Sequence, residues 1–228
     1  MLKGSKIVEV PYFKNQLIDN KKTVLLIGER LGGFEGISEA VHDLEFKNVT
    51  TTDILESPPG CWIQENTNWK HIKSDFIEIR QSIKYDYIIS ISVFEHFGFW
   101  FAGDRMANGL AKDDTCKWNH DLLGINTACK LLKDKDSKLI ITLPAGPYMN
   151  YEDSGEPFLR SYDWRRQNII KSELTTNGYY ISDEKFYLSE DFNKWEEMDS
   201  SINDPKYYSY YNIASPNVIW AFTIQRKI

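Results

Sequence analysis

The chain has 228 residues and a formal net charge of −6, and its residues are 42% hydrophobic and 26% charged. This length and composition predict one folded domain with ample material for a hydrophobic core, and they exclude an intrinsically disordered protein. The acidic balance argues against nucleic acid as a partner, because binding to phosphates depends on a surplus of Lys and Arg.

The sequence also bears on the cellular compartment. Three cysteines, Cys61, Cys116 and Cys129, are odd in number and never spaced C-x-x-C, which favours neither a disulfide framework nor a zinc site. The residues after Met1 form no apolar signal segment, and no apolar run reaches the roughly 18–20 residues of a membrane span. We therefore expect a cytoplasmic protein without a membrane span.

Short apolar runs alternate with amphipathic segments along the chain, which predicts an α/β fold built on a parallel sheet. Runs rich in apolar or β-branched residues predict strands at 23–27, 48–53, 69–73, 85–92, 138–143, 179–187 and 217–225. Apolar residues spaced three or four apart, together with end signals, predict helices at 37–44, 76–83, 122–132 and 161–177, the last with Ser161 as its N-cap. No repeat or linker divides the chain, so we expect a single domain over 1–228.

Two long segments fall outside this alternation. The segment 94–114 is aromatic and carries glycines, and it is predicted to be a loop. The segment 188–216 is acid-rich and holds several tyrosines. Because structureless loops of that length are uncommon in compact domains, it is expected to be a lid, a short helix or a subunit contact, and a homodimer is left open.

Residues that suit ligand binding follow three of the predicted strands. Glycines at 28–36 follow the first strand, Asp53 ends the second, and Glu95-His96 follow the strand at 85–92. Glycines allow backbone to approach a ligand closely, and a carboxylate can accept both hydroxyl hydrogens of a ribose. The glycine turn after one strand, together with the carboxylate at the end of the next, predicts a nucleoside-containing cofactor. An equally weighted alternative is a tight turn at the glycines and a helix cap at Asp53.

Two nucleotide-binding motifs can be excluded directly. A dinucleotide fingerprint G-x-G-x-x-G would need glycine at position 30, where the chain has Arg30. A P-loop would need G-K-[ST], which does not occur in the sequence.

The order of the motifs resembles class I S-adenosylmethionine-dependent methyltransferases over roughly residues 21–187 and 217–226. In that family the glycine loop holds the methionine part of the cofactor, and the acid after the second strand holds the ribose. Ser74-Asp75-Phe76 looks like the element that contacts adenine. Leu131-Leu132-Lys133, leading into the fifth strand, and Asn177-Gly178-Tyr179, opening the sixth, are also similar to the family.

The resemblance implies a Rossmann-like fold: a mostly parallel seven-stranded sheet with an antiparallel last strand and helices on both faces. It implies S-adenosylmethionine as the cofactor, bound by Gly28, Glu29, Gly32, Asp53, Asp75, Phe76 and Glu95. Leu26 and Arg30 stand where the family usually has an Asp and its middle glycine, and Glu29 could supply the missing charge from the adjacent position.

A narrower pattern runs from Glu95-His96-x-Gly98 to Gly103-Asp104, with Pro144-Ala145-Gly146 after the fifth strand. It looks like bacterial methyltransferases of cell-surface sugar biosynthesis. The resemblance implies methyl transfer to a hydroxyl of a small molecule, a sugar or a nucleotide-sugar used in surface polysaccharide.

A hydroxyl acceptor must lose a proton, and histidine suits that task near neutral pH. His96, at the strand end, is the predicted base, and Asp104 is predicted to orient the acceptor or assist the base. The alternatives are a packed loop histidine and a turn residue after Gly103. Asp113-Asp114 and His120 have no defined ligand spacing, so no metal is expected.

Two other functions remain open from the sequence. Gly28, Gly33 and Asp53 also fit half of a nicotinamide-dependent oxidoreductase, although Arg30 and the lack of a second domain disfavour it. Leu26 and Arg30 are compatible with a methyltransferase-like partner subunit that has lost its cofactor.

Overall fold

A computed structural model describes residues 5–29, 37–56, 68–80, 82–99, 118–146, 150–153, 156–189, 191, 193–198, 210–212, 215–216 and 218–227. Its centre is an eight-stranded sheet in the order β3-β2-β1-β4-β5-β12-β8-β9. The strands are β1 (Thr23–Ile27), β2 (Asn48–Asp53), β3 (Lys70–Lys73), β4 (Tyr87–Ile91), β5 (Lys138–Pro144), β8 (Tyr179–Leu188), β9 (Glu196–Met198) and β12 (Val218–Arg226). Two small antiparallel pairs accompany it, β6 (Asn150–Asp153) with β7 (Glu156–Arg160) and β10 (Tyr210–Asn212) with β11 (Ser215–Pro216).

The strand directions confirm the predicted mostly parallel sheet. The strands from β3 to β5 pair in parallel, whereas β12 pairs antiparallel with both β5 and β8. The antiparallel last strand was predicted. The sheet has one strand more than the seven expected, because β9 pairs antiparallel with β8 at the edge. This three-residue strand reads Glu-Glu-Met and gave no apolar signal.

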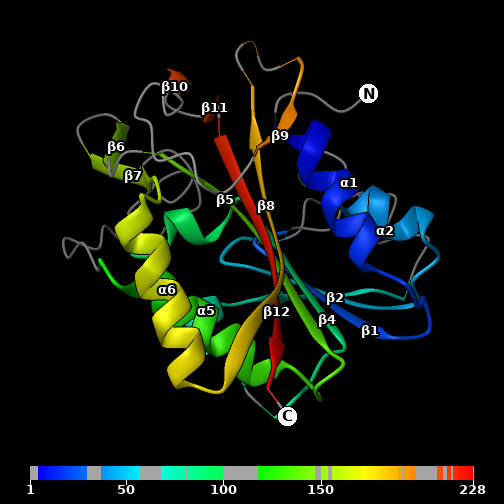
Figure 1. The fold of residues 1–228 in the computed structure, drawn as a ribbon. Coiled ribbons are helices and arrows are strands. Elements are labelled where there is room, and N and C mark those ends of the chain that lie inside the picture. The colour runs from blue at the N-terminus through cyan, green and yellow to red at the C-terminus, as the bar shows by residue number, and fades with distance from the viewer. Residues whose placement is uncertain are drawn as a thin grey trace.

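Helices cover both faces of the sheet, as predicted (Figure 1). The helices α1 (Lys6–Gln16) and α2 (Ile37–Asp43) lie on one face, and α5 (His120–Leu131) and α6 (Trp164–Thr176) lie on the other. Alternate residues of β4 enter the two cores: Ile88 belongs to the cluster under α5 and α6, and Ile89 to the cluster under α1 and α2. β4 is therefore buried on both faces, which its unbroken apolar run predicts.

One predicted helix and the predicted start of another were wrong. The helix predicted at 76–83 is only a three-residue 3-10 turn, η1 (Phe76–Glu78), because Ile79 is already extended. The N-cap of α6 is Asp163 rather than Ser161, and Asp163 Oδ1 accepts a hydrogen bond from Arg166 N at 2.8 Å. The helix cannot begin earlier because Tyr162 is extended and forms a β-bridge with Ala145.

The helix α1 was not predicted. Its sequence contains Pro11 and mixes lysines and a glutamate with the apolar residues, which obscured the helical pattern. None of the described helices is long and apolar enough to cross a membrane.

Candidate functional site

The carboxyl ends of β1, β2 and β4 meet at one edge of the sheet. β1 pairs with β2 on one side and with β4 on the other, and Ile27 lies opposite both Thr52 and Ser90. The strand order reverses here, because the chain runs from β1 outward to β3 and then returns to β4. Ligands of open α/β sheets bind at such a switch point.

Gly28 forms the turn directly after β1. Its N–H donates to Thr52 O at 2.8 Å, so the turn is attached to the end of β2. Gly28 has φ +70°, and a Cβ at this position would lie 2.5 Å from Val93 Cγ1. The close approach that requires glycine is therefore made by the protein's own chain at the end of β4.

Replacement of Gly28 by alanine is expected to destabilise the fold by about 2–4 kcal/mol, because left-handed strain and overpacking add. Gly178→Ala is the matched control, since Gly178 has φ +81° but no atom within 4 Å of its Cβ position. That control should lose only about 1–2 kcal/mol. Urea unfolding measures both, and equal losses would show that contact with Val93 does not matter.

Glu29 is a buried carboxyl next to this turn, with 3% of its surface exposed. Ser38, in the first turn of α2, donates through Oγ to Glu29 Oε1 at 2.8 Å. The carboxyl group of Glu29 therefore lies directly after Gly28, and its role in holding the cofactor stays a prediction. Leu26 is buried in the core under α1 and α2, so it has a packing role.

Asp53 ends β2, and its carboxylate takes part in the following turn. Oδ1 accepts a hydrogen bond from Leu55 N at 2.8 Å. His71 holds the same turn, with Nε2 2.8 Å from Leu55 O and Nδ1 2.8 Å from Thr51 Oγ1. In the described residues Asp53 therefore stabilises a turn rather than the helix cap that the sequence left open as an alternative. His71, which had no predicted role, is the residue that fixes this turn.

Asp75 and Phe76 follow β3 at the same edge. Asp75 is exposed, and its Oδ1 accepts from Ile77 N at 3.0 Å, which caps η1. Phe76 is buried and its ring lies 6.3 Å from that of Phe94 and 6.2 Å from that of Phe97. Both residues thus have structural contacts, and their assignment to adenine stays a prediction.

Glu95 and His96 lie on η2 (Phe94–His96), the 3-10 turn that follows β4. His96 is half-buried, and its backbone N–H donates to Val93 O at 3.0 Å. Glu95 is 3% exposed, and its Oε2 has no hydrogen-bond partner among the described residues. Burial raises the pKa of Glu95 to about 8, and the Glu9 carboxylate adds to this rise.

Several predicted residues lie outside the described part of the chain: Gly32, Asp104, Arg30, Gly33, Asp113 and Asp114. Within the described residues, no group of three His, Cys, Asp or Glu side chains is arranged to hold a metal ion.

The helix α1 adds a buried ionic group to this edge, and this group was not predicted from the sequence. Glu9 is fully buried, and Ser92 and Thr142 donate to its Oε1. Burial opposes ionisation of Glu9, but the charge of Lys6 and these hydrogen bonds outweigh it and lower the pKa of Glu9. The one signal in the sequence is a glutamate placed between Val8 and Val10.

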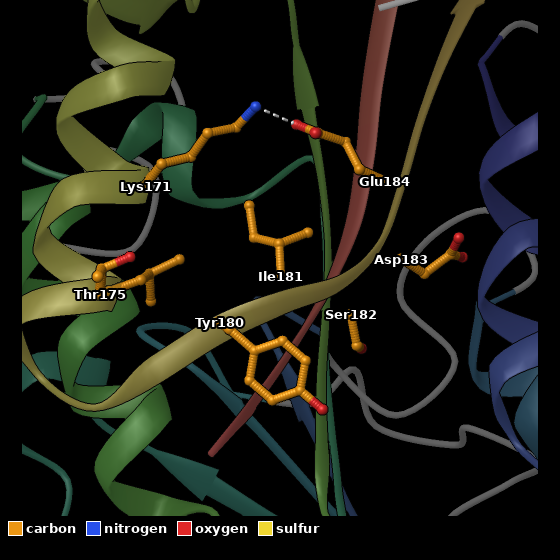
Figure 2. Close-up of a pocket in the computed structure, with 8 residues that line it drawn as sticks. Lys171, Thr175, Tyr180, Ile181, Ser182, Asp183 and Glu184 are labelled. Atoms are coloured by element: carbon orange, nitrogen blue, oxygen red, sulfur yellow. Dashed lines mark ion pairs between the residues drawn. The ribbon is translucent and has the colours of Figure 1, made fainter. Parts of the chain in front are cut away.

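A separate hollow of about 300 Å³ lies between α6 and β8 (Figure 2). Lys171 of α6 and Glu184 of β8 form an ion pair of 2.7 Å across it. Tyr180, which lines the hollow, pairs with the part of β12 that lies beside the amino end of β5. The other end of β8, at Leu188, lies on the side of the carboxyl end of β5. This hollow is therefore away from the edge that carries Gly28 and Asp53.

No protein-family profile and no curated protein sequence matches the chain. Solved structures do match it. The 1,6-didemethyltoxoflavin-N1-methyltransferase of Burkholderia thailandensis, with bound S-adenosylhomocysteine, has a TM-score of 0.55 at 13% identity, over 91% of this chain and 72% of that chain. A glycopeptide N-methyltransferase complexed with S-adenosylhomocysteine has a TM-score of 0.55 at 9% identity, over 99% and 91%. An S-adenosylmethionine-dependent methyltransferase from Clostridium acetobutylicum has a TM-score of 0.53 at 11% identity, over 97% and 89%.

At these identities the likeness is one of fold. The chain has the Rossmann-like fold of class I S-adenosylmethionine-dependent methyltransferases, which confirms the predicted fold class.

Proposed function

We propose that this chain is an S-adenosylmethionine-dependent methyltransferase. The observation that carries the proposal is that the Gly28 turn and Asp53 lie at adjoining strand ends, at the switch point of a methyltransferase fold. The structures similar to it include methyltransferases with bound S-adenosylhomocysteine, which supports this function over a nicotinamide-dependent oxidoreductase. A subunit that has lost its cofactor differs from the proposed enzyme in one property, its cofactor affinity.

The donor set at this edge suits the cofactor. Asp53 offers a carboxylate for the ribose hydroxyls, and Glu29 offers a buried carboxyl group as the proposed partner of the cofactor's ammonium group. Asp75 is the proposed contact of the adenine amino group. Gly28, Gly32, Phe76 and Glu95 complete the proposed set. When bound, the cofactor supplies a methyl group attached to a positively charged sulfur.

We further propose a small-molecule acceptor, with a hydroxyl of a sugar or nucleotide-sugar preferred. The pattern that begins at Glu95-His96-x-Gly98 and returns at Pro144–Gly146 supports this choice. In the proposed reaction His96 accepts the proton of the acceptor, and Asp104 orients the acceptor. Two similar structures are named as N-methyltransferases, so a nitrogen acceptor is the competing outcome. Acceptor trials with matched hydroxyl and amine compounds decide between them.

The proposed domain covers 1–228, and β9 adds part of the segment 188–216 to the edge of the sheet. We propose that this segment forms a lid or a subunit contact of a cytoplasmic enzyme. Analytical ultracentrifugation tests the homodimer.

Replacement of Asp53 by asparagine is expected to weaken binding of S-adenosylhomocysteine by about 1.5–3 kcal/mol, the size of a hydrogen bond to a charged group. Asparagine keeps an oxygen for Leu55 N, so the turn is preserved while the charge is lost. Calorimetric titration measures the change.

Asp134→Asn is the matched control for that experiment. Asp134 Oδ1 accepts from Asp136 N at 2.9 Å in a turn before the amino end of β5, away from the site. Its substitution should leave the affinity unchanged. Unchanged affinity in Asp53→Asn would remove Asp53 from the binding site.

A further inference from the structure

The carboxylate of Glu9 connects α1 to the ends of two central strands. Ser92 Oγ, directly after β4, donates to Glu9 Oε1 at 2.5 Å. Thr142 Oγ1, within β5, donates to the same oxygen at 2.6 Å. Lys6 Nζ lies 3.0 Å from Glu9 Oε2. One buried carboxylate therefore collects two hydroxyls and an ammonium group.

Ser92 has a backbone conformation that a residue with a side chain rarely adopts. Its φ is +53°, and Glu45 is the other residue besides glycine with a positive φ among those described. This conformation costs free energy, so it persists only where surrounding contacts enforce it. Ser92 N donates to Thr142 O at 3.1 Å, and the Ser92 side chain is fixed by Glu9.

The turn at Ser92 determines the path of the chain into the candidate site. The next residue, Val93, lies against Gly28, and Val93 O accepts the N–H of His96 at 3.0 Å. The position of η2 relative to the Gly28 turn therefore depends on the conformation of Ser92. Strain of this kind is concentrated at functional sites, where the surrounding structure maintains it.

We propose that Glu9 is a positioning residue for the cofactor site. By holding Ser92 in its left-handed conformation, Glu9 fixes η2 against the Gly28 turn and so sets the affinity for the cofactor. The effect on affinity rests on the proposed function, whereas the effect on η2 does not. A carboxylate is required because Glu9 accepts hydrogen bonds on one oxygen and pairs with Lys6 through the other.

A rescue experiment tests this role. Binding of S-adenosylhomocysteine is measured by calorimetry for wild type, Glu9→Ala, Ser92→Gly and the double variant. Glu9→Ala should bind about tenfold more weakly or worse, and Ser92→Gly should bind about as well as wild type, because glycine adopts the left-handed conformation without strain. In the Ser92→Gly background the loss of Glu9 should cost less than about threefold. An equal loss in both backgrounds, or no loss in either, would overturn the proposal.

Hydrogen exchange gives a readout that needs no cofactor. Glu9→Ala should speed exchange of the amides of η2 and Phe97, and adding Ser92→Gly should restore part of the protection. Tyr12→Phe is the control: Tyr12 is also buried on α1, but its hydroxyl contacts Thr223 Oγ1 of β12 at 3.1 Å. It should leave η2 protected. If the η2 amides exchange as fast in Tyr12→Phe as in Glu9→Ala, α1 acts only through overall stability, and the proposal is wrong. If the variants show the expected exchange pattern but the wild type binds no cofactor, the proposed function is rejected and the effect of Glu9 on η2 still holds.

Discussion

Replacement of Glu95 by glutamine is expected to stabilise the protein relative to wild type, and increasingly so from about pH 5 to about pH 8. Burial raises the pKa of Glu95 from 4.5 to about 8, so the folded protein keeps a proton that the unfolded chain has lost. Because the unfolded state then binds fewer protons, wild-type stability falls by about 1.4 kcal/mol for each pH unit in this window. Glutamine does not titrate and is spared this loss.

Urea unfolding of both proteins at about pH 5 and about pH 8 measures the difference, which should grow to an order of 4 kcal/mol. Glu173→Gln serves as the control, because Glu173 is exposed on α6 and its variant should follow the wild-type pH dependence. A difference between Glu95→Gln and wild type that stays constant with pH would show that Glu95 is ionised in the folded protein.

Replacement of His96 by glutamine is expected to lower turnover by about 10²–10⁴-fold while leaving cofactor affinity unchanged, since a general base contributes on that scale. Wild-type turnover should rise with pH through about pH 6–7, where histidine loses its proton, and this rise should vanish in the variant. The measurement is methyl transfer to an acceptor identified from hydroxyl and amine candidates.

His42→Gln is the matched substitution for His96→Gln. His42 lies on α2 with its ring 6.2 Å from that of Trp69, and its replacement should leave the pH profile unaltered. If His96→Gln lowers only the melting temperature and keeps near-wild-type turnover, His96 is structural, and Asp104 becomes the candidate base.

Seven of the eight strands of the central sheet could be predicted, because each of them is marked by a local run of apolar or β-branched residues, and β9 is the exception. The predicted ranges 23–27 and 48–53 match β1 and β2. These runs of apolar or β-branched residues are bounded by polar residues or glycine, such as Lys22, Gly28 and Asp53, which mark the strand ends. η1 shows the limit of local patterns: apolar residues at 76–83 fit a helix, but among the described residues of this range only Phe76 is buried.

The contribution of α1 to the site could not be predicted, because it depends on contacts between distant parts of the chain. Glu9 meets Ser92 across 83 residues and Thr142 across 133 residues. Similarly, Asp53 and Glu95 were identified from their strand-end positions, but the hydrogen bond from Leu55 N to Asp53 and the lack of a described partner for Glu95 Oε2 follow from packing.

Calorimetric titration of the purified chain with S-adenosylmethionine tests the central claim most directly. We expect saturable binding to one site per chain, weakened in Asp53→Asn and unchanged in Asp134→Asn. Absence of detectable binding by the folded wild type, with and without candidate acceptors, would contradict the proposed methyltransferase function.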